Sequence, residues 1–361
     1  MRTAGKVAAA LGAVVLGVGA PVGFVVHGAG APGRADSAQL WWERLRRLPQ
    51  PVLRPPPRES SVRAGGEKVK RARAEAKVVE VRGIPAQSPV VAVAELGELL
   101  AVATFDGGAF AVERGGTVHR VEGVEAVNAV AFDAEGNLCL ASDDGAFVAA
   151  PGERARKVAG GAFTAVAYVQ GAVWFASPGG VARLDARGMR RWGADQGVVV
   201  DHPTSIAECG ERICLGALDG FRELEIGADG APRVVGAQVT LPAEFVTAVA
   251  SNSLGTWVGT FDGGLVRLGD SPLTPVDGLP EGRIQPRAMA VVGDQVFAGT
   301  PAGLLVVRGR TAALVPVGGE VSAVAPSGQG GIWVGLSGRA VRVEVDELSS
   351  GQTTLANSRN P

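Results

Sequence analysis

The sequence has few of the side chains that most enzymes use for catalysis or metal binding. Its 361 residues include three histidines, three cysteines and one tyrosine. No His, Cys and Asp spacing typical of a zinc site is present, and no nucleophile and base can be paired from neighbouring motifs. We therefore expect no metal, no cofactor and no enzymatic activity.

The three cysteines are far from the N-terminus, which excludes a bacterial lipoprotein signal. Cys139 is typical of a small buried hydrophobic residue. A two-residue turn at Glu211 and Arg212 would place the sulfur atoms of Cys209 and Cys214 opposite each other on paired strands. The sequence leaves a disulfide and two free thiols equally open.

The net charge of −1 hides an uneven distribution. Residues 1–77 carry a net charge of +9, whereas residues 78–361 carry −10. An acidic body repels phosphates, so we expect no nucleic-acid partner. After residue 82, only 187–192 combines clustered arginines with an aromatic residue, and we interpret it as a solvated loop.

A basic leader at residues 1–6 precedes 20 residues without a charge at positions 7–26. As a helix this run would extend about 30 Å, the thickness of the hydrocarbon core of a bilayer. The alternative is a cleaved signal peptide with a cleavage site at residues 29–31. Because the run is longer than the apolar region of most signal peptides, we favour a single-pass anchor in a bacterial cell membrane. The rest of the chain would then lie in the periplasm or outside the cell.

Residues 27–76 are expected to form a juxtamembrane helix followed by a linker rich in proline and arginine. Trp41 and Trp42 of this helix would either lie at the membrane interface or dock on the folded domain. We expect residues 347–361 to be a disordered polar tail. Residues 77–346 remain for the folded domain.

One motif recurs seven times between residues 89 and 343. Its clearest copy is Val246-Thr-Ala-Val-Ala250 followed by Gly255-Thr-Trp-Val-Gly-Thr-Phe-Asp-Gly-Gly-Leu-Val-Arg-Leu268. This copy predicts two strands, a turn at residues 262–264 and a third strand. The glycines at the turn are 35 to 44 residues apart, at Gly108, Gly145, Gly180, Gly220, Gly264, Gly303 and Gly338. This spacing is the length of one blade, so we predict an all-β, seven-bladed β-propeller of four-stranded blades.

Small residues dominate the first strand of each unit, as crowding near a central axis would require. Trp174, Trp257 and Trp333 share one position in the second strand. We expect these rings to fill the space between blades rather than to stack on a ligand.

The order Val-x-Ala-Val-Ala, then Trp-Val-Gly-Thr-x-x-Gly-Gly-Leu-x-Arg-Leu, resembles the two-component regulator propeller repeat. The resemblance covers about residues 89–343 and is strongest at 246–268. Such blades form sensor domains outside the membrane, so the resemblance implies an extracytoplasmic sensor. No kinase or DNA-binding segment follows Val343, and we do not expect phospho-signalling by this polypeptide itself.

A ring of blades keeps two open edges unless its first and last strands pair. Residues 77–81 precede the first unit and are typical of an outer strand. The last unit lacks a fourth strand before the polar tail. We predict that residues 77–81 complete the seventh blade.

The turns between second and third strands should share one rim of the ring with the loops that lead into each first strand. We expect a ligand to bind at this rim, although Asp before Gly is also ordinary turn chemistry. The candidate binding residues are Phe105, Asp106, Asp144, His202, Asp219, Phe261, Asp262, Arg283 and Arg287.

These features predict a membrane-tethered binding module that acts as a sensor or scaffold for an unidentified ligand or envelope protein. The alternative is a propeller enzyme of the lyase, lactonase or glycoside hydrolase type with its site in the central channel. The inner strands offer Val and Ala where such chemistry uses carboxylates or histidines, so we favour binding.

Overall fold

The computed structural model describes residues 70–71, 76–81, 83–85, 88–113, 116–236, 239–268, 274–275, 282–309 and 311–345. The predicted leader, anchor, juxtamembrane helix and tail lie outside these residues. Within the described ranges no helix is long and apolar enough to cross a membrane.

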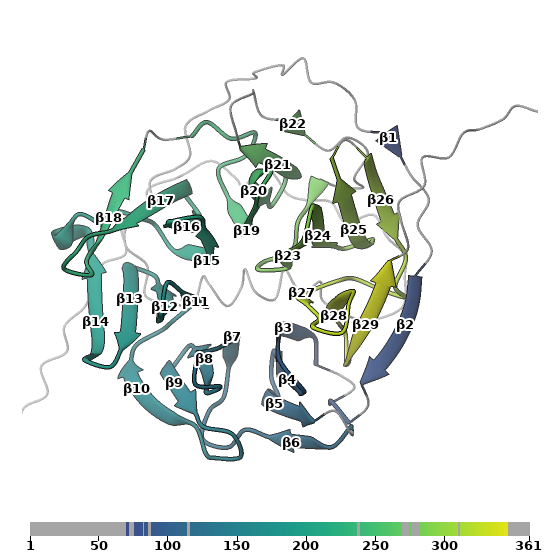
Figure 1. The fold of residues 1–361 in the computed structure, drawn as a ribbon, viewed down its shortest axis with the longest axis horizontal. Coiled ribbons are helices and arrows are strands. Elements are labelled where there is room, and N and C mark those ends of the chain that lie inside the picture. The colour runs from purple at the N-terminus through teal and green to yellow at the C-terminus, as the bar shows by residue number, and fades with distance from the viewer. Residues whose placement is uncertain are drawn as a thin grey trace, which may run out of the picture. The chain divides into compact units, whose positions relative to one another are not determined.

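Seven sheets surround a central axis, and each forms one blade of four antiparallel strands (Figure 1). The first strands lie innermost and successive strands lie further out, so the predicted seven-bladed propeller is confirmed. Blades 1 to 3 are β3 to β6 (Val90–Leu96, Leu99–Thr104, Gly108–Glu113, Val118–Arg120), β7 to β10 (Val127–Phe132, Leu138–Ser142, Gly145–Ala149, Arg156–Gly160) and β11 to β14 (Ala165–Val169, Ala172–Ser177, Gly180–Asp185, Gly188–Gly193). Blades 4 and 5 are β15 to β18 (Pro203–Cys209, Arg212–Ala217, Gly220–Ile226, Pro232–Val235) and β19 to β22 (Val246–Asn252, Gly255–Thr260, Leu265–Leu268, Thr274–Pro275). A short 3-10 helix, Ala194–Gln196, lies between blades 3 and 4.

The ring closes through the N-terminal part of the described chain. Blade 6 consists of β23 to β26 (Met289–Val292, Gln295–Thr300, Gly303–Arg308, Thr311–Val315), and blade 7 of β27 to β29 (Ala323–Pro326, Ile332–Leu336, Arg339–Val345). Strand β2 (Ala76–Val81) pairs antiparallel with β29 and supplies the fourth strand of blade 7. This pairing confirms the predicted closure. Strand β1 (Lys70–Arg71) pairs parallel with β26 on the outer edge of blade 6.

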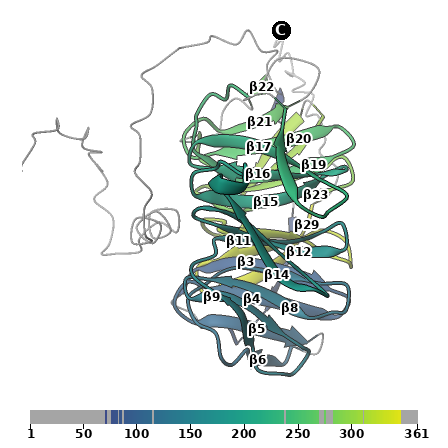
Figure 2. The same cartoon turned by 90° about the vertical axis from the view of Figure 1, so that its left-hand side faces the viewer.

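The apolar core is divided among the contacts between neighbouring blades. In the described part of the chain, seven buried clusters each join two adjacent blades. One of them joins blade 7 to blade 1, with Ala323 and Ala340 packed in the same cluster as Val90 and Val102. The blades stack side by side around the ring (Figure 2). Each sheet therefore buries both of its faces, and no blade has a complete core of its own.

The motif residues explain how closely the blades approach. A Cβ atom added at Gly259 would lie 2.6 Å from Cγ2 of Ile284, on the segment that leads into the next blade. Trp174 and Trp257 are buried in clusters between blades, as predicted. Arg183 pairs across the strands with Trp174, and its guanidinium carbon lies 5.7 Å from the centre of the Trp174 ring. The Arg of the motif therefore covers the outer side of the Trp.

Trp333 differs from the other two tryptophans. It packs against the cluster between blades 7 and 1 but is only half-buried. Its indole Nε1 donates a hydrogen bond to Oε2 of Glu95 in blade 1. This ring therefore joins two blades through both packing and a polar contact.

Removal of the closing strand is expected to destabilise the whole ring. A chain that begins at residue 83 would lose six cross-strand pairs with β29 and leave the edge of β29 open. At 0.2–1 kcal/mol for each pair, the loss is roughly 1–6 kcal/mol. Chemical denaturation of this chain and of a control chain that begins at residue 70 measures the effect. Equal stability of the two chains would contradict the role of β2.

Truncation of the tryptophans should distinguish their environments. We expect Trp174→Ala to cost about 3–5 kcal/mol, because the replacement leaves a large cavity between blades 3 and 4. Trp333→Ala should cost clearly less, since its ring is already partly exposed. Urea denaturation of both variants tests the order, and the reverse order would show that burial does not set the contribution of this position.

Candidate functional site

The predicted rim exists, because turns and entry loops are hydrogen-bonded to one another on one face of the ring. The amide of Phe105 donates to the Pro89 carbonyl at 2.9 Å, and that of Phe261 donates to the Phe245 carbonyl at 3.0 Å. Each bond joins the turn after a second strand to the loop before a first strand. The candidate residues on this face are distributed over blades 1, 2, 4 and 5 and the connection into blade 6.

The rim carboxylates do not converge on one point. Asp144 forms an ion pair with Lys157 of its own blade at 3.7 Å, and both side chains are exposed. Asp219 binds Arg222 at 2.8 Å, also within its own blade. Asp106 and Asp262 lie in exposed turns of two different blades. These four residues therefore serve separate turns and make no common site.

The threonine that ends the second strand organises these turns. Thr260 Oγ1 accepts a hydrogen bond from the Gly263 amide and donates one to the Gly264 carbonyl, each at 2.9 Å. Thr104 makes the corresponding bonds in blade 1. The Asp-Gly turn chemistry expected from the sequence is thus supported by a buried hydroxyl below it.

Three rim residues of blade 5 and the following loop do form one structure. The rings of Phe245 and Phe261 are stacked, with centroids 5.1 Å apart and an interplanar angle of 11°. The guanidinium carbon of Arg283 lies 4.5 Å from the centre of the Phe261 ring. All three side chains are half-buried, and neither Phe belongs to a cluster between blades. We call Phe245, Phe261 and Arg283 the rim platform.

Sequence reasoning missed Phe245, although a signal was present. This Phe directly precedes the Val246 motif, where blade 1 has Pro89 and blade 2 has Ala126. An aromatic residue in that entry position lies beside the turn of its own blade, because the two segments are hydrogen-bonded.

His202 lies at the same rim, in the loop before β15, but is buried. The side chain is 2% exposed, and its Nδ1 lies 2.6 Å from Oδ1 of Asp201. The backbone of His202 is left-handed, with φ of +44°, an uncommon conformation for this residue type. Its amide donates to the Pro178 carbonyl of blade 3 at 3.2 Å. The imidazole therefore sits between blades 3 and 4 and does not reach the rim surface.

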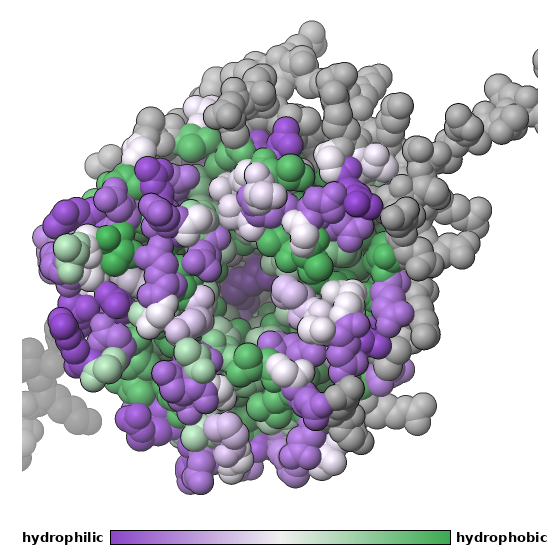
Figure 3. Space-filling view, in the orientation of Figure 1, coloured by the Kyte–Doolittle hydropathy of each residue, from purple (hydrophilic) through white to green (hydrophobic). Residues whose placement is uncertain are grey.

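The first strands of all seven blades line an open central cavity of about 930 Å³. Ala and Val make up most of its walls, as the sequence predicted. Hydrophilic residues are visible inside the central hollow in Figure 3. Arg287 is the only predicted rim residue that lines this cavity.

The second residue of the five-residue motif that opens each unit is polar in six of the seven blades. We call it the second position; it is occupied in blades 1 to 7 by Val91, Asn128, Thr164, Thr204, Thr247, Arg287 and Ser322. Several of these side chains join one blade to the next. Asn128 Nδ2 donates to the Phe163 carbonyl at 2.9 Å, and Ser322 Oγ donates to the Val90 carbonyl at 2.6 Å. Thr164 and Thr204 make the same kind of bond to Pro203 and Val246.

Arg287 is the one charged residue in this series, in which Val91 is apolar and Thr247 donates to the Gly259 carbonyl of its own blade. Its Nη1 donates a 3.1 Å hydrogen bond to the Thr164 carbonyl, which belongs to blade 3, whereas Arg287 leads into blade 6. The backbone at Arg287 is left-handed, with φ of +58°, and its amide donates to the Thr247 carbonyl. The side chain therefore crosses the mouth of the cavity.

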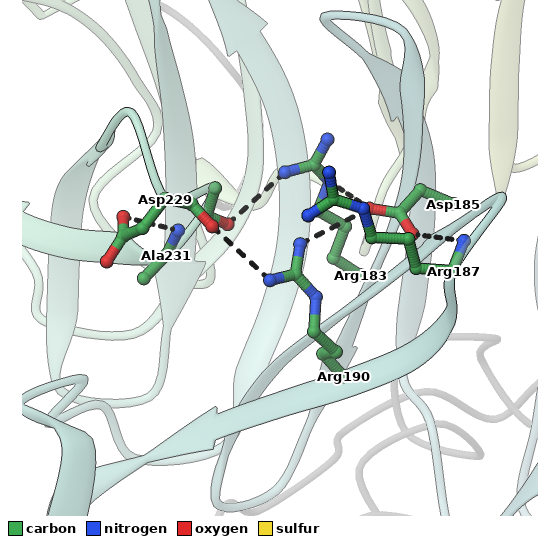
Figure 4. A network of polar contacts seen from close by, with 7 residues as sticks. Arg183, Asp185, Arg187, Arg190, Asp229 and Ala231 are labelled. Atoms are coloured by element: carbon green, nitrogen blue, oxygen red, sulfur yellow. Dashed lines mark hydrogen bonds and ion pairs between the residues drawn. The ribbon is translucent and has the colours of Figure 1, made fainter.

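The segment at residues 187–192 is not the solvated loop that we expected. Residues Gly188–Gly193 form β14, the outer strand of blade 3. Arg183 and Arg190 both approach Oδ2 of Asp185 at 3.3 Å and also donate to main-chain carbonyls of the Asp229 turn in blade 4 (Figure 4). The prediction failed because residues 188–193 pair with the whole length of β13, and Arg190 is held by Asp185 and by a carbonyl of blade 4.

The carboxyl of Asp185 is stabilised in its ionised form. Its pKa lies below the usual value of 3.8, mainly because the Arg187 amide donates a hydrogen bond to it, while Arg183 and Arg190 act in the same direction. Partial burial opposes this shift. The cluster therefore braces blades 3 and 4 on the outside of the ring.

Cys209 and Cys214 form a disulfide, with Cα atoms 5.8 Å apart. The expected turn position was wrong, because Cys209 pairs with Arg212 and the turn lies at Gly210 and Glu211. The bridge is therefore diagonal across the hairpin of β15 and β16. Burial raises the pKa of the remaining thiol, Cys139, to about 12, and the nearby Asp133 and Glu135 add to the shift.

Among the described residues, no group of three or more His, Cys, Asp and Glu side chains is placed to hold a metal ion. The acidic and histidine candidates of the rim are too scattered to act as a ligand set.

No family model and no curated protein sequence matches the chain. Solved structures do match, all at low sequence identity. A catalytically inactive virginiamycin B lyase from Staphylococcus aureus with quinupristin has a TM-score of 0.63 at 11% identity, over 75% of this chain and 99% of that one. A gluconolactonase-family structure has a TM-score of 0.51 at 13% identity, over 77% and 94% of the two chains.

A third similar structure is the extracellular domain of a protein assigned as a hybrid two-component system of B. thetaiotaomicron. Its TM-score is 0.62 at 16% identity, over 74% of this chain but only 40% of that one. At these identities the comparisons establish the propeller fold alone. They include both enzymes and a domain of a signalling system, so the fold does not select between the two functions.

The thiols provide a direct test of the cysteine arrangement. Native protein should not react with a thiol reagent at pH 8, because Cys139 is buried and its pKa is raised to about 12. Unfolded, unreduced protein should show one reactive thiol, and unfolded, reduced protein three. Mass spectrometry after alkylation gives the count, and three reactive thiols without a reductant would contradict the disulfide.

Proposed function

We propose that this protein is a non-enzymatic, extracytoplasmic β-propeller, tethered to the membrane through residues 7–26, that binds a ligand or an envelope protein at its rim. The rim platform of Phe245, Phe261 and Arg283 is the observation that carries this proposal. Phe and Arg are enriched at protein interfaces, and Arg is among the residues that most often dominate their binding energy. Here they are stacked on a partly exposed rim instead of being buried between blades.

The stack also pre-organises the platform for binding. Arg283 is held over one ring face, so its side chain has lost much of its freedom before a partner arrives. An aromatic surface with a fixed cation suits a partner that presents a flat or apolar group beside an anionic one. A sensor or scaffold role outside the cytoplasm fits this chemistry.

The disulfide supports the proposed compartment. Disulfides persist in oxidising environments and are rare in the cytosol. The bridge between Cys209 and Cys214 agrees with a location outside the cytoplasmic membrane, to which the apolar run at residues 7–26 also points. A reporter that is active only in the periplasm, fused after residue 361, should be active, and a cytoplasmic reporter at the same place should not.

One observation favours a second candidate, a propeller enzyme. His202 and Asp201 form a hydrogen-bonded pair of the kind used in general acid–base catalysis. The imidazole is 2% exposed, however, and it does not line the central cavity. Binding is therefore the better supported function. Turnover of the bound ligand that is lost in His202→Gln would reverse this preference.

The rim experiment compares three forms of the full-length protein. The double variant Phe261→Ser/Arg283→Glu removes the stack and reverses its charge. Arg233→Glu is the matched control, since Arg233 is an exposed arginine on the outer strand of blade 4. We expect the double variant to bind the captured partner at least tenfold more weakly than wild type, in the range of an interface hot spot, and the control to bind normally. Capture of the same partners with the same affinity by all three forms would overturn the proposal.

A further inference from the structure

We propose that the central cavity is a second binding site, which takes a small molecule with an apolar body and a carboxylate head that binds Arg287. This inference rests on the proposed binding function but concerns a different surface from the rim platform. It is carried by the cavity, by the departure of Arg287 from the repeat pattern, and by the distribution of charge along the channel.

The cavity has the size and lining of a ligand site. Its volume of 930 Å³ lies within the range of about 300–1,000 Å³ typical of small-molecule pockets. Most of its wall comes from Ala and Val side chains of seven first strands. An apolar body that entered this space would pack against these side chains and lose part of its contact with water.

Blade 6 has the long, charged side chain of Arg287 at the second position, where five other blades have a short polar side chain. At the second position, Asn128, Thr164, Thr204 and Ser322 each donate to a carbonyl of the following blade. At Arg287, Nη1 donates to a carbonyl of blade 3, across the ring. Blade 6 is the one described blade with a charged side chain at this position, and departures from a repeat pattern are expected at functional positions.

The backbone conformation at Arg287 also indicates a functional position. A left-handed conformation at a non-glycine residue costs free energy and persists only where the surrounding structure enforces it. The preceding residue is Pro286, and the Arg287 amide is held by the Thr247 carbonyl of blade 5. These constraints fix the direction from which the side chain enters the cavity mouth.

The charges on the cavity wall are arranged along its axis. Arg287 lies where the first strands begin, whereas Glu95 and Glu208 lie where two of them end. Along β3, Glu95 is the fourth residue after the second position, Val91, which is roughly 13 Å at 3.3 Å per residue. An anionic head is attracted to the Arg287 end and repelled from the Glu end. The field therefore orients the ligand, with the carboxylate at Arg287 and the apolar chain along the wall.

The chemistry of the guanidinium selects the head group. Its planar fork presents parallel N–H donors that match the two oxygens of a carboxylate. The hydrogen bond to the neutral Thr164 carbonyl uses Nη1 and braces the fork across the mouth. A carboxylate that approaches from the channel side would meet an already positioned cation, which lowers the cost of ordering it.

The test uses full-length protein in nanodiscs, because detergent would compete for an apolar channel. Equilibrium dialysis measures binding of butyrate, hexanoate and octanoate, with octanamide as the neutral analogue of octanoate and empty nanodiscs as the background. We expect wild type to bind octanoate at least tenfold more tightly than octanamide. Affinity should rise about fourfold for each added methylene that the wall buries.

Three variants assign the selectivity. Arg287→Gln keeps a donor of similar shape without the charge and should bind octanoate and octanamide equally. Arg287→Lys keeps the charge but lacks the planar pair of donors. Its preference for octanoate over octanamide should lie between those of Arg287→Gln and wild type. Arg233→Gln removes an exposed arginine on the outer strand of blade 4, outside both the channel and the rim platform, and should behave as wild type does. Thermal unfolding of each variant reports whether the ring is intact.

Unchanged octanoate binding in Arg287→Gln would overturn the inference, as would failure of wild type to prefer octanoate to octanamide. If Arg287→Gln does not fold, two measurements on wild type still test the inference. These are its preference for octanoate over octanamide and the change in its affinity with chain length. The rim experiment is independent, because it changes only Phe261 and Arg283. Suppose that the rim variant loses its partner and that wild type binds no carboxylate. The proposed function would then be supported, and only the channel site would be contradicted.

Discussion

Burial between neighbouring blades is the interaction on which the rest of this structure depends. Each four-stranded sheet is apolar on both faces, so a single blade cannot hide its own surface from water. A linear stack would leave two such faces and two edges exposed. Closure of the ring by β2 removes them, and the cluster between blades 7 and 1 is equivalent to the other six. The described β-structure is therefore stable only as a whole ring.

The same constraint creates the channel. Seven first strands meet around one axis, where small side chains allow them to approach and still leave an open core. Polar residues at the second position then join the seams where space for apolar packing is least. The seam between blades 4 and 5 illustrates this: its buried apolar cluster has five residues, and both Thr204 and Ser205 hydrogen-bond across it. Arg287 uses the same position to face the cavity.

The two proposed binding surfaces, the rim platform and the channel, differ in origin. The rim platform is assembled from turns that can vary without disturbing the seams, because loops lie outside the packed clusters. The channel is part of the packing itself, so a residue such as Arg287 must satisfy both the ring and a ligand. His202 and the Asp185 cluster are also polar but lie between blades or on the outer side, where they brace blades 3 and 4.

The blade count, the strand order within a blade, the inter-blade tryptophans and the closing strand followed from the sequence alone. These features repeat at a fixed period or depend on residues close along the chain, so local pattern is enough to reveal them. The rim platform and the contact of Arg287 could not be predicted from local pattern in this way. Phe245 and Phe261 come together through a turn contact, and Arg287 meets the carbonyl of Thr164 at a separation of 123 residues. Only the curvature of the closed ring brings blade 6 opposite blade 3, and no local pattern contains that distance.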